Sequence, residues 1–179
     1  QVRPNGVTDH RIIDSMAGIA RENFVPEKRR SVAYLDEDVV IAPGRFLIEA
    51  MAFAKLLQLA EIRPTDRVLH IGAGTGYGSA VIVPLARSVT ALEGDASLAS
   101  KARVNLASCH GVEVVEGPLD QGWSAAAPYD VIIIEGRVGE VPQNVLHQLA
   151  DNGRLVAVSG EGDVSKAMIW TAQGSGFAS

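Results

Sequence analysis

Three glycines at alternate positions, Gly72, Gly74 and Gly76, follow a short apolar run and precede an apolar helical segment. Glycine lacks a Cβ atom and tolerates positive φ, so a glycine turn lets the backbone approach a ligand closely. The free N–H groups of the helix that follows point into the same turn. The spacing therefore predicts a ligand site at the end of a buried strand, with a purely structural turn as the alternative.

The spacing also limits the kind of ligand. The dinucleotide pattern G-x-G-x-x-G requires a third glycine where this chain has Tyr77, so a nicotinamide oxidoreductase is disfavoured. The chain instead reads G-A-G-T-G, a form typical of S-adenosylmethionine (SAM) methyltransferases. Glu93 ends the next apolar run, about 20 residues later, where a carboxylate can accept both hydroxyls of a ribose. The turn and Glu93 together predict a nucleoside ligand.

Composition excludes several other classes of protein. The chain has 179 residues, 47% of them hydrophobic, which fits a single α/β domain. Its net charge of −5 provides no basic surface for nucleic acid, and no apolar run approaches the roughly 20 residues that span a bilayer. Cys109 is the only cysteine, which favours a reducing cytoplasm. The four histidines are scattered, so we expect no metal site.

Alternating strands and helices must position the glycine turn. Helical segments separate apolar strands, which indicates βαβ units and a doubly wound, mostly parallel, Rossmann-like sheet. The strands are predicted at residues 68–71, 89–92, 112–115, 131–134, 155–158 and 167–171. Pro84 should kink or shorten the helix after the turn, and a helix starting at Pro142 should end at residues 151–153. We expect one domain over residues 1–179 with an incomplete C-terminus: an N-terminal helical and substrate-loop extension (1–60) and a cofactor-binding core (61–179).

The chain resembles the protein-L-isoaspartate O-methyltransferases over nearly its whole length. The segment ENFVPEKRRSVAYLDEDVVI resembles the family's lead-in, and VLHIGAGTGYGSAV resembles its SAM turn. APYDVIII and NVLHQLADNGRLVAVSG resemble the fourth strand and the helix and strand that follow it. The resemblance implies SAM as cofactor and a set of residues that contact it. These are Gly72, Ala73, Gly74, Thr75, Gly76, Tyr77, Glu93, Gly94, Gly117, Pro118 and Leu119.

Two departures affect the cofactor side. His70 stands where the family has an acidic residue, so it is either an ordinary buried histidine or marks the loss of one hydrogen bond to the cofactor. The family's Gly-Asp-Gly, whose aspartate faces the adenine amino group, is replaced by residues 117–119, which read Gly-Pro-Leu, and Asp120 comes two places late. Each lost hydrogen bond would cost about 0.5–1.5 kcal/mol. SAM remains the expected cofactor because the turn and Glu93 are present.

The largest departure is in the substrate loop. The family has Thr-Ile-Ser-x-Pro after a glycine, whereas the residues after Gly44 read RFLIEA. The hydroxyls are lost and Glu49 adds a negative charge near an anionic acceptor. Arg45 could compensate through a bidentate contact to a carboxylate, although an arginine beside a turn is more often a surface residue. The expected substrate-binding residues are Arg45, Phe46, Ile48 and Glu49.

Methyl transfer to a carboxylate requires no general base, because the acceptor is already an anion at pH 7. We therefore expect no catalytic residue, and expect the rate to come from alignment and the removal of water. The resemblance implies a monomeric, cytoplasmic SAM-dependent O-methyltransferase that repairs isoaspartyl residues in damaged proteins, without nucleic-acid or membrane partners. A methyltransferase with a different acceptor and a SAM-binding protein without turnover are the alternatives.

Overall fold

The computed structural model describes residues 6–159, 166–174 and 176–178. Its centre is a seven-stranded sheet with the order β5-β4-β3-β6-β7-β8-β9. The first five strands in that order, from β5 through β4, β3 and β6 to β7, run parallel to one another. Strands β8 and β9 are antiparallel and form one edge of the sheet. The predicted doubly wound, mostly parallel sheet is confirmed. The strands are β3 (Arg67–Ile71), β4 (Ser88–Glu93), β5 (Val112–Glu116), β6 (Tyr129–Val138), β7 (Leu149–Ser159), β8 (Lys166–Gln173) and β9 (Gly176–Ala178).

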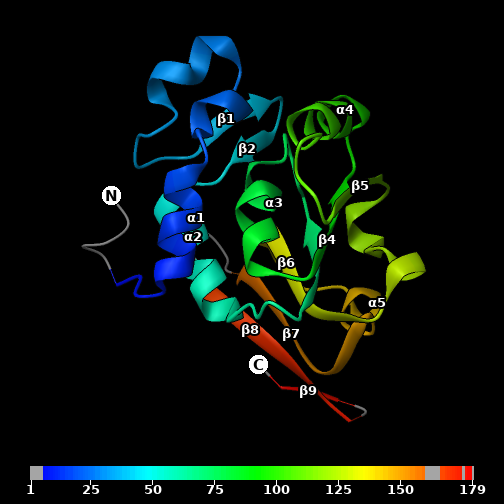
Figure 1. Ribbon diagram of the computed structural model, residues 1–179. Helices are drawn as coiled ribbons and strands as arrows, with labels where there is room; N and C mark the ends of the chain where they lie inside the picture. The colour runs from blue at the N-terminus through cyan, green and yellow to red at the C-terminus, as the bar shows by residue number, and fades with distance from the viewer. Residues whose placement is uncertain (1–5, 160–165, 175, 179) are drawn as a thin grey trace.

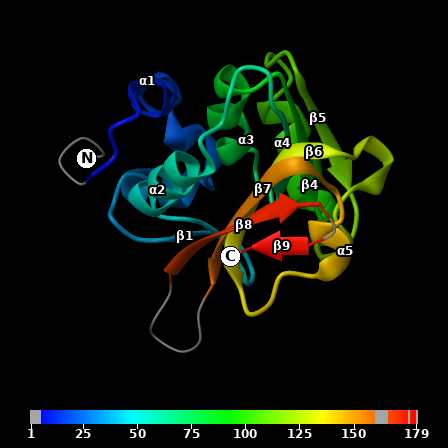
Figure 2. The ribbon, with the colours of Figure 1, turned by 90° about the horizontal axis from the view of Figure 1, so that it is seen from below.

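Helices cover both faces of this sheet (Figures 1 and 2). Side chains alternate along each strand, so Val68 of β3 packs into one core while Leu69 and Ile71 pack into the other. The core that contains Val68 is closed by α1 (His10–Gly18), α2 (Ala50–Ala60), α3 (Tyr77–Ile82) and α4 (Ala96–Asn105). The opposite core is closed by α5 (Gln143–Leu146) and the 3₁₀-helices η5 (Leu119–Gln121) and η6 (Ser124–Ala126). No helix in the described ranges is long and apolar enough to cross a membrane.

The N-terminal segment, which includes α1, packs on the same face of the sheet as α2, α3 and α4, and it contributes a small hairpin. Asp9 caps α1 by accepting a hydrogen bond from the N–H of Arg11, as its position before an apolar helical pattern suggests. The 3₁₀-helices η2 (Arg21–Phe24) and η3 (Glu27–Val32) lead to strands β1 (Val39–Ala42) and β2 (Arg45–Leu47). The hairpin lies beside α4 at one end of the molecule (Figure 1).

Pro84 shortens its helix as predicted: α3 ends at Ile82 and continues as the 3₁₀-helix η4 (Val83–Leu85). The helix predicted to start at Pro142 and to end at residues 151–153 is much shorter than expected, because α5 covers only Gln143–Leu146 and β7 already begins at Leu149. The predicted stop at residues 151–153 instead lies inside β7. The register between β6 and β7 shifts there and Asn152 has φ 60°, so the polar residues form an irregularity within the strand.

Candidate functional site

The glycine turn joins β3 to α3 at the carboxyl end of the sheet. Gly72, Gly74 and Gly76 have φ values of 82°, 56° and 97°, a region that favours glycine. The N–H groups of Gly72 and Ala73 donate to the carbonyl of Leu92, 2.9 and 3.1 Å away, which holds the turn against β4. A Cβ atom on Gly72 would lie 3.0 Å from the carbonyl oxygen of Glu135, so the turn is also packed closely against β6.

Glu93 is fully buried at the end of β4, and its carboxylate accepts hydrogen bonds from five donors. The N–H of Gly74 donates to Oε2 at 2.7 Å, and those of Gly94 and Asp95 donate to Oε1 at 2.8 and 2.9 Å. Arg45 donates through both of its terminal nitrogens, at 2.5 and 2.6 Å. The backbone donors fix the carboxylate at the glycine turn, and Arg45, which lines a cavity, donates to both of its oxygens.

The contact that Arg45 makes in the structure therefore differs from the one that its position in the sequence suggested. It belongs to β2, in the predicted substrate loop, but its guanidinium forms an ion pair with Glu93 on the cofactor side. The hydrogen bond to Glu93 raises the pKa of Arg45 above its ordinary value. The pair ties the β1–β2 hairpin to the carboxylate that was expected to bind a ribose.

A cavity of about 700 Å³ opens beneath this hairpin, and we call it the hairpin cavity. All four predicted substrate-binding residues line it, together with Gly72 of the glycine turn. The charged lining contains three carboxylates and two guanidinium groups, from Asp38, Glu49, Glu135, Arg45 and Arg137. The structure thus brings the predicted substrate residues to one cavity beside the predicted cofactor turn.

A second cavity of about 340 Å³, the strand-end cavity, lies on the α5 side of Gly72. It shares Gly72 and Glu135 with the hairpin cavity, and Leu119 and Asp120 also line it. The loops after β4 and β5 meet nearby, since a Cβ atom on Gly94 would lie 3.4 Å from both the Gly117 carbonyl and the Leu119 side chain. The predicted cofactor residues Gly94, Gly117, Pro118 and Leu119 therefore belong to two adjoining loops.

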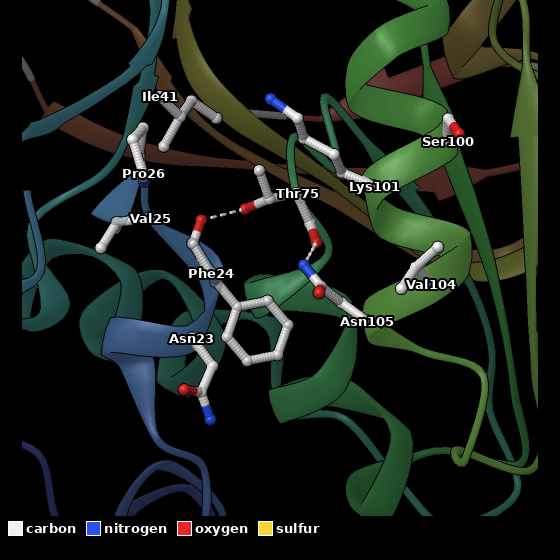
Figure 3. A pocket seen from close by; sticks show the side chains of 10 residues that line it. All are labelled: Asn23, Phe24, Val25, Pro26, Ile41, Thr75, Ser100, Lys101, Val104 and Asn105. Atoms are coloured by element: carbon white, nitrogen blue, oxygen red, sulfur yellow. Dashed lines mark hydrogen bonds between the residues drawn. The ribbon is translucent and has the colours of Figure 1, made fainter. Parts of the chain in front are cut away.

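Thr75 and Tyr77, two of the predicted cofactor contacts, point away from these cavities. Figure 3 shows a smaller cavity of about 260 Å³ between η2 and α4, in which the Thr75 hydroxyl donates to the carbonyl of Phe24 at 2.6 Å. Asn105 of α4 donates to the carbonyl of Thr75 at 2.8 Å (Figure 3). Tyr77 is buried beneath Arg21, and this burial raises the pKa of its phenol. In this structure both side chains attach the N-terminal segment to the turn.

Glu135 was not predicted as a site residue, and it has no counterpart in the motifs on which the resemblance rests. Its side chain is 4% exposed, and its Oε2 lies 2.9 Å from Nε2 of the fully buried His70. On the other side of the imidazole ring, Nδ1 lies 2.8 Å from the Ser79 hydroxyl. The available signal was a carboxylate directly after the apolar strand of residues 131–134, at the edge of the sheet where ligands bind.

Replacing Gly78 by alanine tests how tightly this cluster is packed. The new Cβ atom would overlap Glu135 Oε2 and lie 2.7 Å from His70 Cε1 and 2.9 Å from Phe53 Cζ. We expect the free energy of unfolding, measured by urea denaturation, to fall by about 1–3 kcal/mol because the core becomes overpacked. Gly18→Ala is the matched helical control, since nothing lies within 4 Å of its Cβ position. Equal free energies of unfolding for the two variants would contradict the close packing around Gly78.

Comparison with known proteins identifies relatives over most of the chain. The family model "Protein-L-isoaspartate(D-aspartate) O-methyltransferase (PCMT)" matches residues 1–175. A protein-L-isoaspartate O-methyltransferase from Methanoculleus marisnigri is 40% identical over 162 residues, which cover 89% of this chain and 74% of the relative. One from Koribacter versatilis is 37% identical over 158 residues, which cover 87% of this chain and 71% of the relative.

Solved structures show the same fold. A protein-L-isoaspartate O-methyltransferase with 25% sequence identity superposes with a TM-score of 0.82, and the match covers 97% of this chain and 58% of that one. A candidate protein-L-isoaspartate O-methyltransferase from Plasmodium falciparum, in complex with S-adenosyl-L-homocysteine, also gives a TM-score of 0.82. Its identity is 18%, and the match covers 99% of this chain and 88% of that one.

Proposed function

Because this chain belongs to the protein-L-isoaspartate O-methyltransferase family, we propose that it transfers a methyl group from SAM to the carboxylate of isoaspartyl residues in damaged proteins. One observation supports this most strongly. Gly72 of the glycine turn lines the same cavity as all four substrate-loop residues, and Arg45 of that loop forms an ion pair with the buried Glu93. Cofactor and acceptor would therefore meet at Gly72.

The residues present fit SAM. Gly72, Gly74 and Gly76 have positive φ and no side chain that would block a ligand at the turn, and Glu93 offers a carboxylate at the end of the adjacent strand. Leu119 supplies an apolar wall in the strand-end cavity, and Gly94, Gly117 and Pro118 complete the two loops beside it. When bound, SAM supplies an activated methyl group on its sulfonium. Ribose hydroxyls could bond to Glu93 only after Arg45 has moved, since Arg45 now occupies both carboxylate oxygens.

This exchange gives Arg45 two successive partners. Once released from Glu93, its guanidinium remains in the hairpin cavity and can take the acceptor carboxylate in a bidentate contact. Phe46 and Ile48 line the same cavity and exclude water from the two reacting charges. Arg45, Phe46, Ile48 and Glu49 would therefore position the acceptor, and no residue needs to remove a proton.

The remaining parts of the proposal concern the protein as a whole. We propose that residues 1–60 and 61–179 form one domain, in which the N-terminal extension covers the cofactor-binding core. We also propose that the protein is a cytoplasmic monomer without nucleic-acid or membrane partners. The single cysteine supports the cytoplasmic location, and the net charge of −5 supports the absence of a nucleic-acid partner.

A different acceptor is the second candidate, and one observation favours it. Asp38, Glu49 and Glu135 place three carboxylates around the hairpin cavity. An anionic acceptor would be repelled by them unless Arg45 or Arg137 offset the charge, whereas a neutral or cationic group would not be repelled.

The test is transfer of a labelled methyl group from SAM to an isoaspartyl peptide, with the matched aspartyl peptide as control. Base-labile label on the isoaspartyl peptide alone is the expected result. Label on an amine-bearing peptide in preference to the isoaspartyl one would favour the second candidate. Absence of label on every peptide, in protein that calorimetry shows to bind SAM, would contradict both and leave a binding protein without turnover.

A further inference from the structure

Glu135 stands at the carboxyl end of the sheet, one strand away from the glycine turn on the side opposite Glu93. Strands β3 and β6 pair in register up to Ile71 and Ile134, so Glu135 comes directly beside Gly72. The ladder between β6 and β7 shifts register between Ile134 and Arg137, which releases Glu135 and Gly136 from regular pairing. Such irregularities re-aim side chains at the ends of strands.

The Glu135 carboxylate is buried without full compensation. Its Oε2 lies 2.9 Å from His70 Nε2, but neither atom has a hydrogen-bond partner of good alignment among the described residues. The tautomer with the proton on Nε2 fits both neighbours, because Nδ1 then accepts from the Ser79 hydroxyl while Nε2–H faces the carboxylate. A carboxylate can accept several bonds, so Oε2 retains capacity for a further donor.

Serine, histidine and glutamate in contact also suggest a hydrolytic triad, but the burial excludes that role. Ser79 lies within α3 and is fully buried, as is His70. A nucleophile must reach its substrate, and this hydroxyl reaches only the ring beside it. The end of the cluster that meets a cavity is Glu135, which borders both the hairpin cavity and the strand-end cavity.

The order of strands gives the direction in which a ligand would lie. Glu93 ends β4, the glycine turn follows β3, and Glu135 lies in β6 directly after the segment that pairs with β3. These three strands are neighbours in the order β4-β3-β6. Two strand spacings amount to about 9–10 Å. A nucleoside held at Glu93 would therefore place a short substituent across Gly72 and bring its far end to Glu135.

We propose that Glu135 binds the α-ammonium group of the methionyl part of SAM, with His70 orienting its carboxylate. This inference rests on the proposed use of SAM. It also accounts for His70, which replaces the acidic residue that the family has on β3. In this chain the negative charge comes from the neighbouring strand, and the imidazole holds it in place.

The proposal is tested by measuring, by calorimetry, the affinity of the Glu135→Gln variant for two ligands. SAM carries the ammonium group, whereas 5′-methylthioadenosine keeps the nucleoside and lacks the amino-acid part. We expect E135Q to weaken SAM binding about 10-fold to 100-fold, as loss of a charge-assisted hydrogen bond would, and to leave methylthioadenosine binding unchanged. Glu113→Gln removes an exposed carboxylate of β5 that lines neither cavity and is the matched control. Unchanged SAM binding in E135Q, or equal losses for both ligands, would overturn the proposal.

A second measurement uses the wild-type protein and does not depend on whether the variant folds. SAM and its deaminated analogue, which retains the carboxylate, are compared by calorimetry. We expect at least 10-fold weaker binding of the analogue, and equal affinities would overturn the assignment. Both tests are separate from methyl transfer: wild-type protein that binds SAM without methylating peptides would contradict the proposed activity while leaving the role of Glu135 intact.

Discussion

Replacing Arg45 with glutamine is expected to raise the affinity for SAM by about 10-fold while lowering methyl transfer to an isoaspartyl peptide. In the present structure Arg45 occupies both oxygens of Glu93, to which we propose that the ribose binds. The charge-assisted bonds that must break are worth about 1.5–3 kcal/mol each, much of which water returns to the released guanidinium. Transfer falls because the guanidinium is no longer present in the hairpin cavity to hold the acceptor carboxylate.

The same substitution is expected to reduce the stability of the protein. A gain in SAM affinity despite this loss would distinguish competition by Arg45 from general damage to the fold. Glu93 keeps three backbone N–H donors, so its carboxylate remains partly compensated after Arg45 is removed. We expect the free energy of unfolding of the ligand-free protein to fall by about 1–2 kcal/mol. A variant that was merely damaged would lose both stability and affinity.

Calorimetry with SAM, urea denaturation and the labelled-methyl assay measure these three effects. Arg103→Gln is the control, because it removes a half-exposed arginine that lies 3.9 Å from Glu116 on the surface; we expect all three quantities to stay near wild type. Weaker SAM binding in R45Q would show that Arg45 supports the cofactor site and does not compete with the ligand.

Replacing Arg21 with methionine is expected to lower the free energy of unfolding by about 3–4 kcal/mol. Arg21 is 1% exposed, and it donates to the carbonyls of Ala33 at 2.7 Å and Ile48 at 2.6 Å. Its guanidinium also lies 4.9 Å from the centre of the Tyr77 ring. Methionine fills much of the volume but leaves both carbonyls without a donor, which is among the larger effects that a point substitution produces.

Urea denaturation of R21M measures the loss directly, provided that the slope of the transition stays unchanged. The melting temperature should fall by about 6–16 °C for a chain of this length. Arg29→Met provides a matched control, since Arg29 is exposed on η3, so a change below about 1 kcal/mol is expected. Similar losses in the two variants would show that Arg21 does not hold the N-terminal segment to α3.

Local patterns were sufficient to predict most of the sheet. A buried strand in a parallel sheet contains a nearly continuous apolar run, and residues 131–134 of β6 show that pattern most clearly. Pro84 acts through its own missing N–H group, so its effect on α3 could also be predicted from the chain alone. The prediction for the end of α5 was wrong for a different reason. Residues 151–153 resemble a helix stop, and only pairing with β6 draws them into β7.

The cluster at Glu135 could not be predicted in the same way. His70 is a departure from the family pattern, and nothing in its neighbours along the chain indicates which group faces it. Glu135 lies far away in sequence and reaches the imidazole because β6 pairs with β3 in register. Gly78 is part of the same arrangement, since a side chain there would occupy the space of the carboxylate.

Residue types at short and fixed spacings were sufficient to predict the glycine turn, Glu93 at the end of the next strand and the altered substrate loop. Which charges meet depends on how the chain folds. Arg45 reaches Glu93 because the β1–β2 hairpin folds over the sheet, and Glu135 reaches His70 because two strands distant in sequence are neighbours. A charge has no preferred partner along the chain, and its partner is set by the burial and register that folding imposes.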